Sequence, residues 1–117
     1  MITLKTLPQA TAQEVFNQVA RHLLKQNAKS VVWGEETRCK YRHEGMKCAA
    51  GCLIGDDEYL PYFEGRLWDN LANTDKVPNN CVSLIGQLQK IHDEKLVKNW
   101  ERELKKLAAS ENLNWNL

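Results

Sequence analysis

The chain has 117 residues, of which 43% are hydrophobic and 26% are charged, which is ordinary for a globular protein. This length predicts a single compact domain, residues 1–117, that can bury a core without disulfides or metal. The formal charge of +1, from 16 basic and 15 acidic residues, excludes a strong overall field for nucleic acid or anionic lipid. We therefore expect neither nucleic acid nor a membrane as a partner.

The compartment is predicted from the N-terminus and the cysteines. Residues 1–5 lack the apolar core of a signal peptide, and the longest near-apolar run, residues 48–54, is too short to cross a bilayer. We therefore expect a cytoplasmic protein. In a reducing compartment its four cysteines would be thiols or metal ligands.

The first half of the chain predicts one long helix and a short hairpin. Thr11-Ala-Gln-Glu14 is a capping box, and the apolar residues after it recur at helical spacing to about Lys25. Residues 31–33 are too short to classify. Residues 38–42 and 46–48 are predicted to pair as antiparallel strands across 43–45, because Gly45 tolerates the positive φ of a tight turn. A short buried helix is predicted over 48–55.

The second half predicts helices. Residues 56–59 and 67–71 suggest short helical turns, and Asn80 is the predicted N-cap of a helix over 81–92. A last helix is predicted over 96–109. The predicted fold class is α+β and mainly α, with helices packed around one short antiparallel hairpin.

Three of the four cysteines and one histidine lie close together in the sequence. Cys39, His43, Cys48 and Cys52 offer the four ligands that a structural zinc needs, although their spacing is not that of Cys-x-x-Cys pairs. The alternative is structural: Ala49, Ala50 and Gly51 would permit close approach of another element, with Cys48 and Cys52 as small buried hydrophobes. We favour the structural interpretation.

A catalytic thiol needs a lowered pKa and a nearby base. His92 precedes Asp93, but adjacent residues on a helix do not face each other, so we expect His92 to act as a cation at a helix C-terminus. A weaker hypothesis is a small enzyme that uses His92 with the acidic residues 56–58. Nucleophile elbows, phosphate loops and His-Glu-x-x-His pairs are absent from the sequence, so catalysis is not the expected function.

An acidic and aromatic segment is the candidate partner-binding surface. Aromatic side chains supply contact area in protein interfaces, and carboxylates would steer a basic partner. The alternative is a charged turn whose aromatic rings fold inward. The candidate residues are Asp56, Asp57, Glu58, Tyr59, Tyr62, Glu64 and Trp68.

A dense pattern runs from position 39 to position 59. It reads Cys39-x-Tyr41-Arg42-x-x-Gly45-x-x-Cys48-Ala49-x-Gly51-Cys52-Leu53-Ile54-x-Asp56-x-x-Tyr59, and Ile91-His92-Asp93 and Trp100 follow later. Over residues 13–107 the chain resembles a group of small uncharacterised proteins from bacteria and their tailed phages. The resemblance implies a bacterial or viral origin and a cytoplasmic setting.

Two functions from different classes follow as expectations. The leading one is a phage or prophage accessory protein, without a cofactor, that binds a host protein such as a defence factor and inhibits or redirects it. The alternative is a small metal- or thiol-dependent protein centred on Cys39, His43, Cys48 and Cys52, with zinc as its cofactor.

Overall fold

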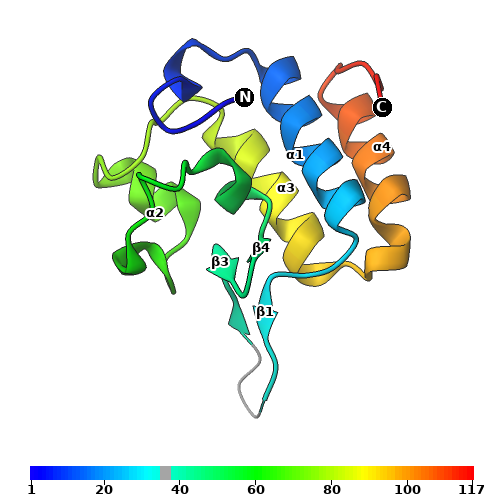
Figure 1. Ribbon diagram of the computed structural model, residues 1–117. Helices are drawn as coiled ribbons and strands as arrows, with labels where there is room; N and C mark the ends of the chain where they lie inside the picture. Colours follow the sequence, from blue (N-terminus) through cyan, green and yellow to red (C-terminus); the bar gives the residue numbers. More distant parts are fainter. Residues whose placement is uncertain (35–37) are drawn as a thin grey trace.

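The fold consists of helices joined by short 3-10 helices and two-residue strands (Figure 1). The computed structural model describes residues 1–34 and 38–117. Its α-helices are α1 (Ala12–Gln26), α2 (Trp68–Asn73), α3 (Val82–Glu94) and α4 (Trp100–Ser110). Short 3-10 helices lie between them: η1 (Leu7–Gln9), η2 (Ala50–Leu53), η3 (Pro61–Phe63) and η4 (Val97–Asn99). The strands are β1 (Val31–Val32), β2 (Arg38–Cys39), β3 (Arg42–His43) and β4 (Met46–Lys47).

Three of the helices, α1, α3 and α4, contact one another, and α2 packs against α3 on the side away from α4 (Figure 1). The hairpins project from one end of this helical group, and both chain termini lie toward the other end (Figure 1). Apart from Val31, the buried apolar residues of the described chain form one cluster that extends from Leu7 to Ala108. The predicted mainly α, α+β fold is confirmed. None of the described helices is long and apolar enough to cross a lipid bilayer.

Helix α1 begins and ends as the sequence predicts. The Thr11 hydroxyl accepts a hydrogen bond from the Glu14 backbone N–H at 3.1 Å, and the Glu14 carboxylate accepts one from the Thr11 N–H at 2.8 Å. This capping box satisfies backbone donors that have no partner within the helix. Asn27 ends the helix with φ +51°, and its N–H donates to the Leu23 carbonyl.

Two hairpins are present among the described residues, where one was predicted. In the predicted one, Arg42 pairs with Lys47 and His43 with Met46, across Glu44 and Gly45, whose φ angles are both positive. Positive φ at both central residues matches the twist of a two-residue hairpin. Arg38 and Cys39 do not extend this hairpin. They pair instead with β1, in the register Val31 to Cys39 and Val32 to Arg38.

The small residues after β4 allow η2 to approach another backbone. A Cβ atom added to Gly51 would lie 2.2 Å from the Tyr41 carbonyl oxygen, so only glycine fits at this position. Ala49 and Ala50 are fully buried beside it. The short buried helix predicted over 48–55 is present as a 3-10 helix that is shorter than expected, Ala50–Leu53. The predicted close approach is confirmed.

The start of α3 differs from the prediction. The N-cap is Cys81, with φ +59°, and it forms no side-chain capping bond. The Asn80 amide instead donates to the Leu7 carbonyl oxygen at 2.7 Å. Asn80 therefore ties the N-terminal segment to the helical group, which is a contact that local spacing does not indicate.

Candidate functional site

A cleft of about 450 Å³ opens between two segments of the chain. One side is formed by β2 and the two residues after it, and the other by residues 64–68. Gln89 and Asp93 of α3 and the buried Cys48 line it as well. This volume lies within the usual range for ligand-binding pockets. We refer to the segment on the second side, residues 60–68, as the 60–68 loop.

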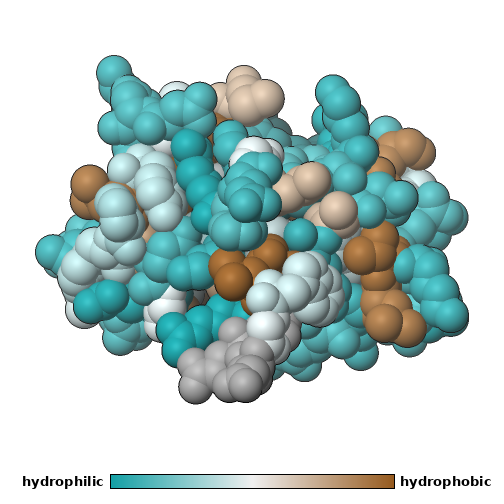
Figure 2. Space-filling model, turned by 60° about the horizontal axis from the view of Figure 1, so that its bottom comes forward, coloured by the Kyte–Doolittle hydropathy of each residue, from teal (hydrophilic) through white to brown (hydrophobic). Residues whose placement is uncertain are grey.

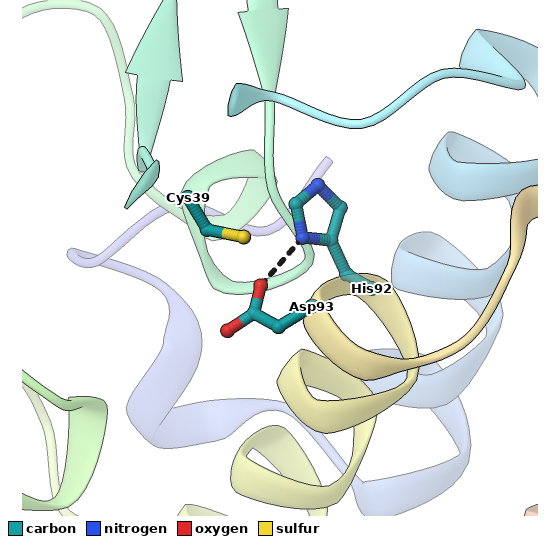
Figure 3. A group of neighbouring side chains, drawn as sticks. All are labelled: Cys39, His92 and Asp93. Carbon is teal, nitrogen blue, oxygen red and sulfur yellow. Dashed lines mark hydrogen bonds and ion pairs between the residues drawn. The ribbon is translucent and has the colours of Figure 1, made fainter. Parts of the chain in front are cut away.

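His92 lies beside the cleft and is completely buried. Its Nε2 atom accepts a hydrogen bond from the Ser30 backbone N–H at 3.0 Å. A backbone N–H is always a donor, so Nε2 carries no proton and the neutral ring holds its proton on Nδ1. Nδ1 lies 2.7 Å from Oδ1 of Asp93 and donates to it (Figure 3). The ring also stacks on Trp100, with 5.6 Å between centroids.

This geometry corrects two expectations about His92. The side chains of His92 and Asp93 do face each other, although the residues are adjacent at the end of α3. His92 is also not a cation exposed at a helix C-terminus, because both ring nitrogens have partners inside the protein. Its hydrogen bond to Ser30 instead joins α3 to the segment before β1.

The Asp93 carboxylate is held by donors from its own chain. Oδ1 accepts from His92 and also from the Gln89 side-chain amide, each at 2.7 Å. The other carboxylate oxygen points away from the imidazole ring (Figure 3). Asp93 is therefore a fixed hydrogen-bond acceptor in the wall of the cleft.

The Cys39 thiol lies next to this carboxylate, and its environment suppresses its reactivity. Burial, the negative charge of Asp93 and a hydrogen bond to that carboxylate raise the pKa of Cys39 to about 11. Only the thiolate is a good nucleophile. Cys39, His92 and Asp93 therefore contain the residue types of a catalytic triad, but the negative charge of the carboxylate opposes thiolate formation.

Cys39, His92 and Asp93 also form a group of potential metal ligands among the described residues. Their ligand atoms lie within 4.8 Å of one another. A metal ion would need the lone pair of Nδ1, because Nε2 is occupied by the Ser30 N–H. Nδ1 carries the proton that it donates to Asp93. The hydrogen bonds of His92 therefore oppose metal binding through this ring.

The four residues considered for zinc do not assemble in the described structure. Cys48 is buried, its sulfur accepts from the Gly51 N–H at 3.2 Å, and burial raises its pKa well above the ordinary value. The Cys52 thiol donates to the Ala49 carbonyl oxygen at 3.2 Å. His43 lies on β3, 3.9 Å from Glu44. Cys48 is thus buried, as the structural interpretation expects, whereas Cys52 is only partly buried.

Most acidic residues of the candidate partner-binding segment form hydrogen bonds or ion pairs within the chain. Glu58 accepts hydrogen bonds from the backbone N–H groups of Leu4, Lys5 and Gly55. Glu64 accepts from the Tyr41 and Arg42 N–H groups and from the Tyr59 hydroxyl. These two carboxylates join loops together and are not presented to a partner.

The other candidate residues divide between core and surface. Trp68 is only 3% exposed, and Tyr59 is half-buried against Phe63, with 6.4 Å between ring centroids. Asp56 is exposed but pairs with Arg42 at 2.7 Å and with Lys47 at 3.6 Å. Asp57 and Tyr62 are exposed. Of the seven candidate residues, only Trp68 is buried, and Glu58, Tyr59 and Glu64 are half-buried with partners in this chain.

Exposed apolar side chains flank the cleft instead. Leu67 is 73% exposed, and Leu60 and Tyr62 lie on the same loop. Trp33 follows β1 on the opposite hairpin and is 74% exposed. Figure 2 shows this end of the molecule, where separate hydrophobic spots interrupt a mostly hydrophilic surface. No local pattern in the sequence indicates which of these residues stay exposed.

The chemistry of the cleft is that of a fixed acceptor, a protonated thiol and a surrounding apolar and basic surface. Comparisons of the chain with protein-family models, with curated proteins and with solved structures found no match.

Proposed function

We propose that this chain acts by binding a protein partner, with the cleft at the centre of the interface. The observation that carries the proposal is the grouping of exposed apolar residues. Of the eight large hydrophobic residues that are exposed in the described chain, one lines the cleft, two lie just before the lining segment 64–68, and one follows β1, which pairs with the lining strand β2. They are Trp33, Leu60, Tyr62 and Leu67.

Large apolar and aromatic side chains lose contact with water when a partner covers them, and such residues supply much of the affinity of protein interfaces. Leu67 lines the cleft itself, and Trp33 follows the strand that pairs with Arg38 and Cys39 in the cleft wall. A protein segment that entered the cleft would contact Leu67 on one side and Trp33 on the other. This favours a protein segment over a small, fully enclosed ligand.

The same geometry makes catalysis a weaker hypothesis. The Cys39 thiol is kept protonated, and the imidazole of His92 is buried with both nitrogens engaged. A nucleophile normally needs an adjacent base and access to its substrate. The network around Asp93 instead supports the wall of the cleft.

The identity of the partner is argued from the resemblance to small bacterial and phage proteins. Small phage proteins of this size often bind and redirect a host protein, so we take the partner to be a bacterial cytoplasmic protein, such as a defence factor, whose activity is inhibited or redirected. This part of the proposal rests on association and is tested together with the surface.

The test is capture from bacterial lysate by the tagged chain, with quantification by mass spectrometry. The wild-type chain is expected to capture one bacterial protein. The captured amount of this protein is expected to fall about tenfold or more with Leu67→Ser and with Trp33→Ala, because each substitution removes a large exposed side chain from the interface. The matched control is Leu117→Ser, since this exposed apolar residue lies at the C-terminus, away from the hairpins (Figure 1).

Capture that Leu67→Ser and Trp33→Ala leave unchanged would contradict the proposal, as would equal loss with Leu117→Ser. Melting temperatures of all three variants separate a binding defect from unfolding. The altered side chains are exposed, so little change in stability is expected.

A further inference from the structure

The charges that line the cleft have different surroundings. Arg38, Lys40 and Arg66 contribute its basic side chains, and Arg38 and Arg66 are exposed. Glu64 and Asp93 contribute its carboxylates. The chemistry of a partner depends on which of these charges face outward.

Both carboxylates are held by hydrogen bonds from their own chain. Glu64 uses its two oxygens for the Tyr41 and Arg42 N–H groups, at 2.9 and 3.2 Å, and for the Tyr59 hydroxyl at 2.6 Å. Asp93 accepts from two side chains of α3 and lies beside the Cys39 thiol. These hydrogen bonds stabilise the charge and occupy the carboxylate oxygens, so the basic side chains are better placed than the carboxylates to pair with a partner.

Two basic side chains, Arg66 of the 60–68 loop and Lys76 after α2, lie beside the Tyr62 ring. The Arg66 guanidinium lies 3.8 Å from the centroid of the Tyr62 ring and donates to the Tyr62 carbonyl oxygen at 2.8 Å. The Lys76 ammonium lies 5.6 Å from the same ring. Cation–π contacts of this kind hold the charges close to the ring while leaving them at the surface. Two basic groups therefore lie at the exposed Tyr62 ring, and one of them, Arg66, also lines the cleft.

From these observations we infer that the cleft and its two borders bind an acidic, amphipathic segment of a partner protein. The inference rests on the proposed protein-binding function and specifies the partner. Apolar side chains of the segment would contact Leu67 and Trp33, while its carboxylates pair with Lys40 and Arg66. This reverses the expectation from the sequence, in which an acidic patch on this chain would attract a basic partner.

The test uses fluorescence anisotropy with three labelled probes: a short peptide of alternating glutamate and leucine, its counterpart with lysine in place of glutamate, and oligothymidylate. The glutamate peptide is expected to bind at low salt, with a Kd that increases about tenfold at high salt, because salt screens exposed charges. The lysine peptide and oligothymidylate are expected not to bind.

Charge reversal locates the site. The double variant Lys40→Glu with Arg66→Glu is expected to weaken the glutamate peptide about tenfold or more, since it replaces two attractions by two repulsions. The matched control is Lys106→Glu on α4, whose side chain is 71% exposed and lies outside the cleft. If the double variant melts early, Lys40→Gln with Arg66→Gln removes the charges without introducing new ones.

Each result separates the inference from the proposed function. If Leu67→Ser weakens binding of the captured protein and the charge variants do not, the proposed protein-binding surface is supported. The inference that the partner segment is acidic is then wrong. Failure of the glutamate peptide to bind at low salt, or equal binding of the lysine peptide, overturns the inference as well. If oligothymidylate binds and the double variant abolishes this binding, the basic groups recognise phosphate groups and not carboxylates, which also overturns the inference. Unchanged capture by Leu67→Ser and Trp33→Ala would contradict the proposed function itself.

Discussion

The proton on His92 determines what its neighbours can do. A buried histidine is least costly when it is neutral and both nitrogens have partners, and Ser30 and Asp93 provide that arrangement. The same proton stabilises the negative charge on Asp93, which in turn keeps the Cys39 thiol protonated. One backbone N–H therefore selects a structural network over a catalytic or metal-binding one.

Gly51 is the residue whose replacement should disturb the fold most. Gly51→Ala would place a methyl group 2.2 Å from the Tyr41 carbonyl oxygen, which requires a shift of one backbone against another. Overpacking of this kind costs about 1–3 kcal/mol, and contact with a backbone carbonyl places it at or above the upper end. The free energy of unfolding, measured by urea denaturation, should fall accordingly.

Gly86 provides the matched comparison, because a Cβ atom there meets nothing within 4 Å and the residue lies inside α3. Gly86→Ala should raise the free energy of unfolding by about 0.5–1 kcal/mol, because alanine loses less conformational freedom in a helix. Equal effects of the two substitutions would contradict the close approach at Gly51.

At the scale of elements, the sequence predicts what local forces determine. The capping box at Thr11 and the apolar spacing behind it define α1, and Gly45 defines the β3–β4 turn, because each acts within a few residues. The pairing of Arg38 and Cys39 with β1 is not predicted, since that strand has two residues and no pattern of its own.

The cleft could not be predicted for a related reason. Acidic residues in a row suggest a charged surface, but Glu58 and Glu64 bind backbone N–H groups of segments distant in the sequence. Trp68 is buried and Leu67 beside it is exposed, which depends on how α2 meets α3 and not on either residue type. Exposure and the sign of the outward charge are thus tertiary properties.

Glu58 fastens the N-terminal segment to the turn before Tyr59, and this contact should depend on pH. Burial acts to raise the pKa of Glu58, but hydrogen bonds from Gly55, Leu4 and Lys5 outweigh it and keep the pKa below the ordinary value of 4.5. A lowered pKa in the folded state means that the carboxylate stabilises the fold above about pH 4.5, and that this contribution is lost as the pH falls through the lowered value.

Hydrogen exchange measured by mass spectrometry can follow this contact. The amides of Leu4 and Lys5 should exchange faster at acidic pH than the intrinsic pH dependence of exchange predicts. Glu58→Gln should produce the same loss of protection at neutral pH, with a cost of about 1–2 kcal/mol for the weakened hydrogen bonds. Asp57→Asn is the control, because this neighbouring carboxylate is exposed. Unchanged protection in Glu58→Gln would show that other contacts hold the segment.

For the whole molecule, the question is whether the core holds together without metal. The apolar cluster brings together residues from α1, η2, α2, α3 and α4, and a chain of 117 residues can bury enough apolar surface to fold on that basis. The described cysteines have partners or surroundings that keep them as thiols, since the pKa of each is raised, mainly by burial.

Removal of metal should therefore leave the fold unchanged. A strong chelator is expected to shift the melting temperature by less than about 1 °C, whereas structural zinc is so strongly coupled to folding that its removal unfolds small domains. Elemental analysis should find far less than one zinc per chain. Added zinc should not raise the melting temperature, because a ligand stabilises a protein only if it binds the folded state. One zinc per chain, together with unfolding by the chelator, would contradict a fold that is independent of metal. Asp93→Asn and Cys48→Ala would then show whether the ion is held beside the cleft or within the cysteine segment.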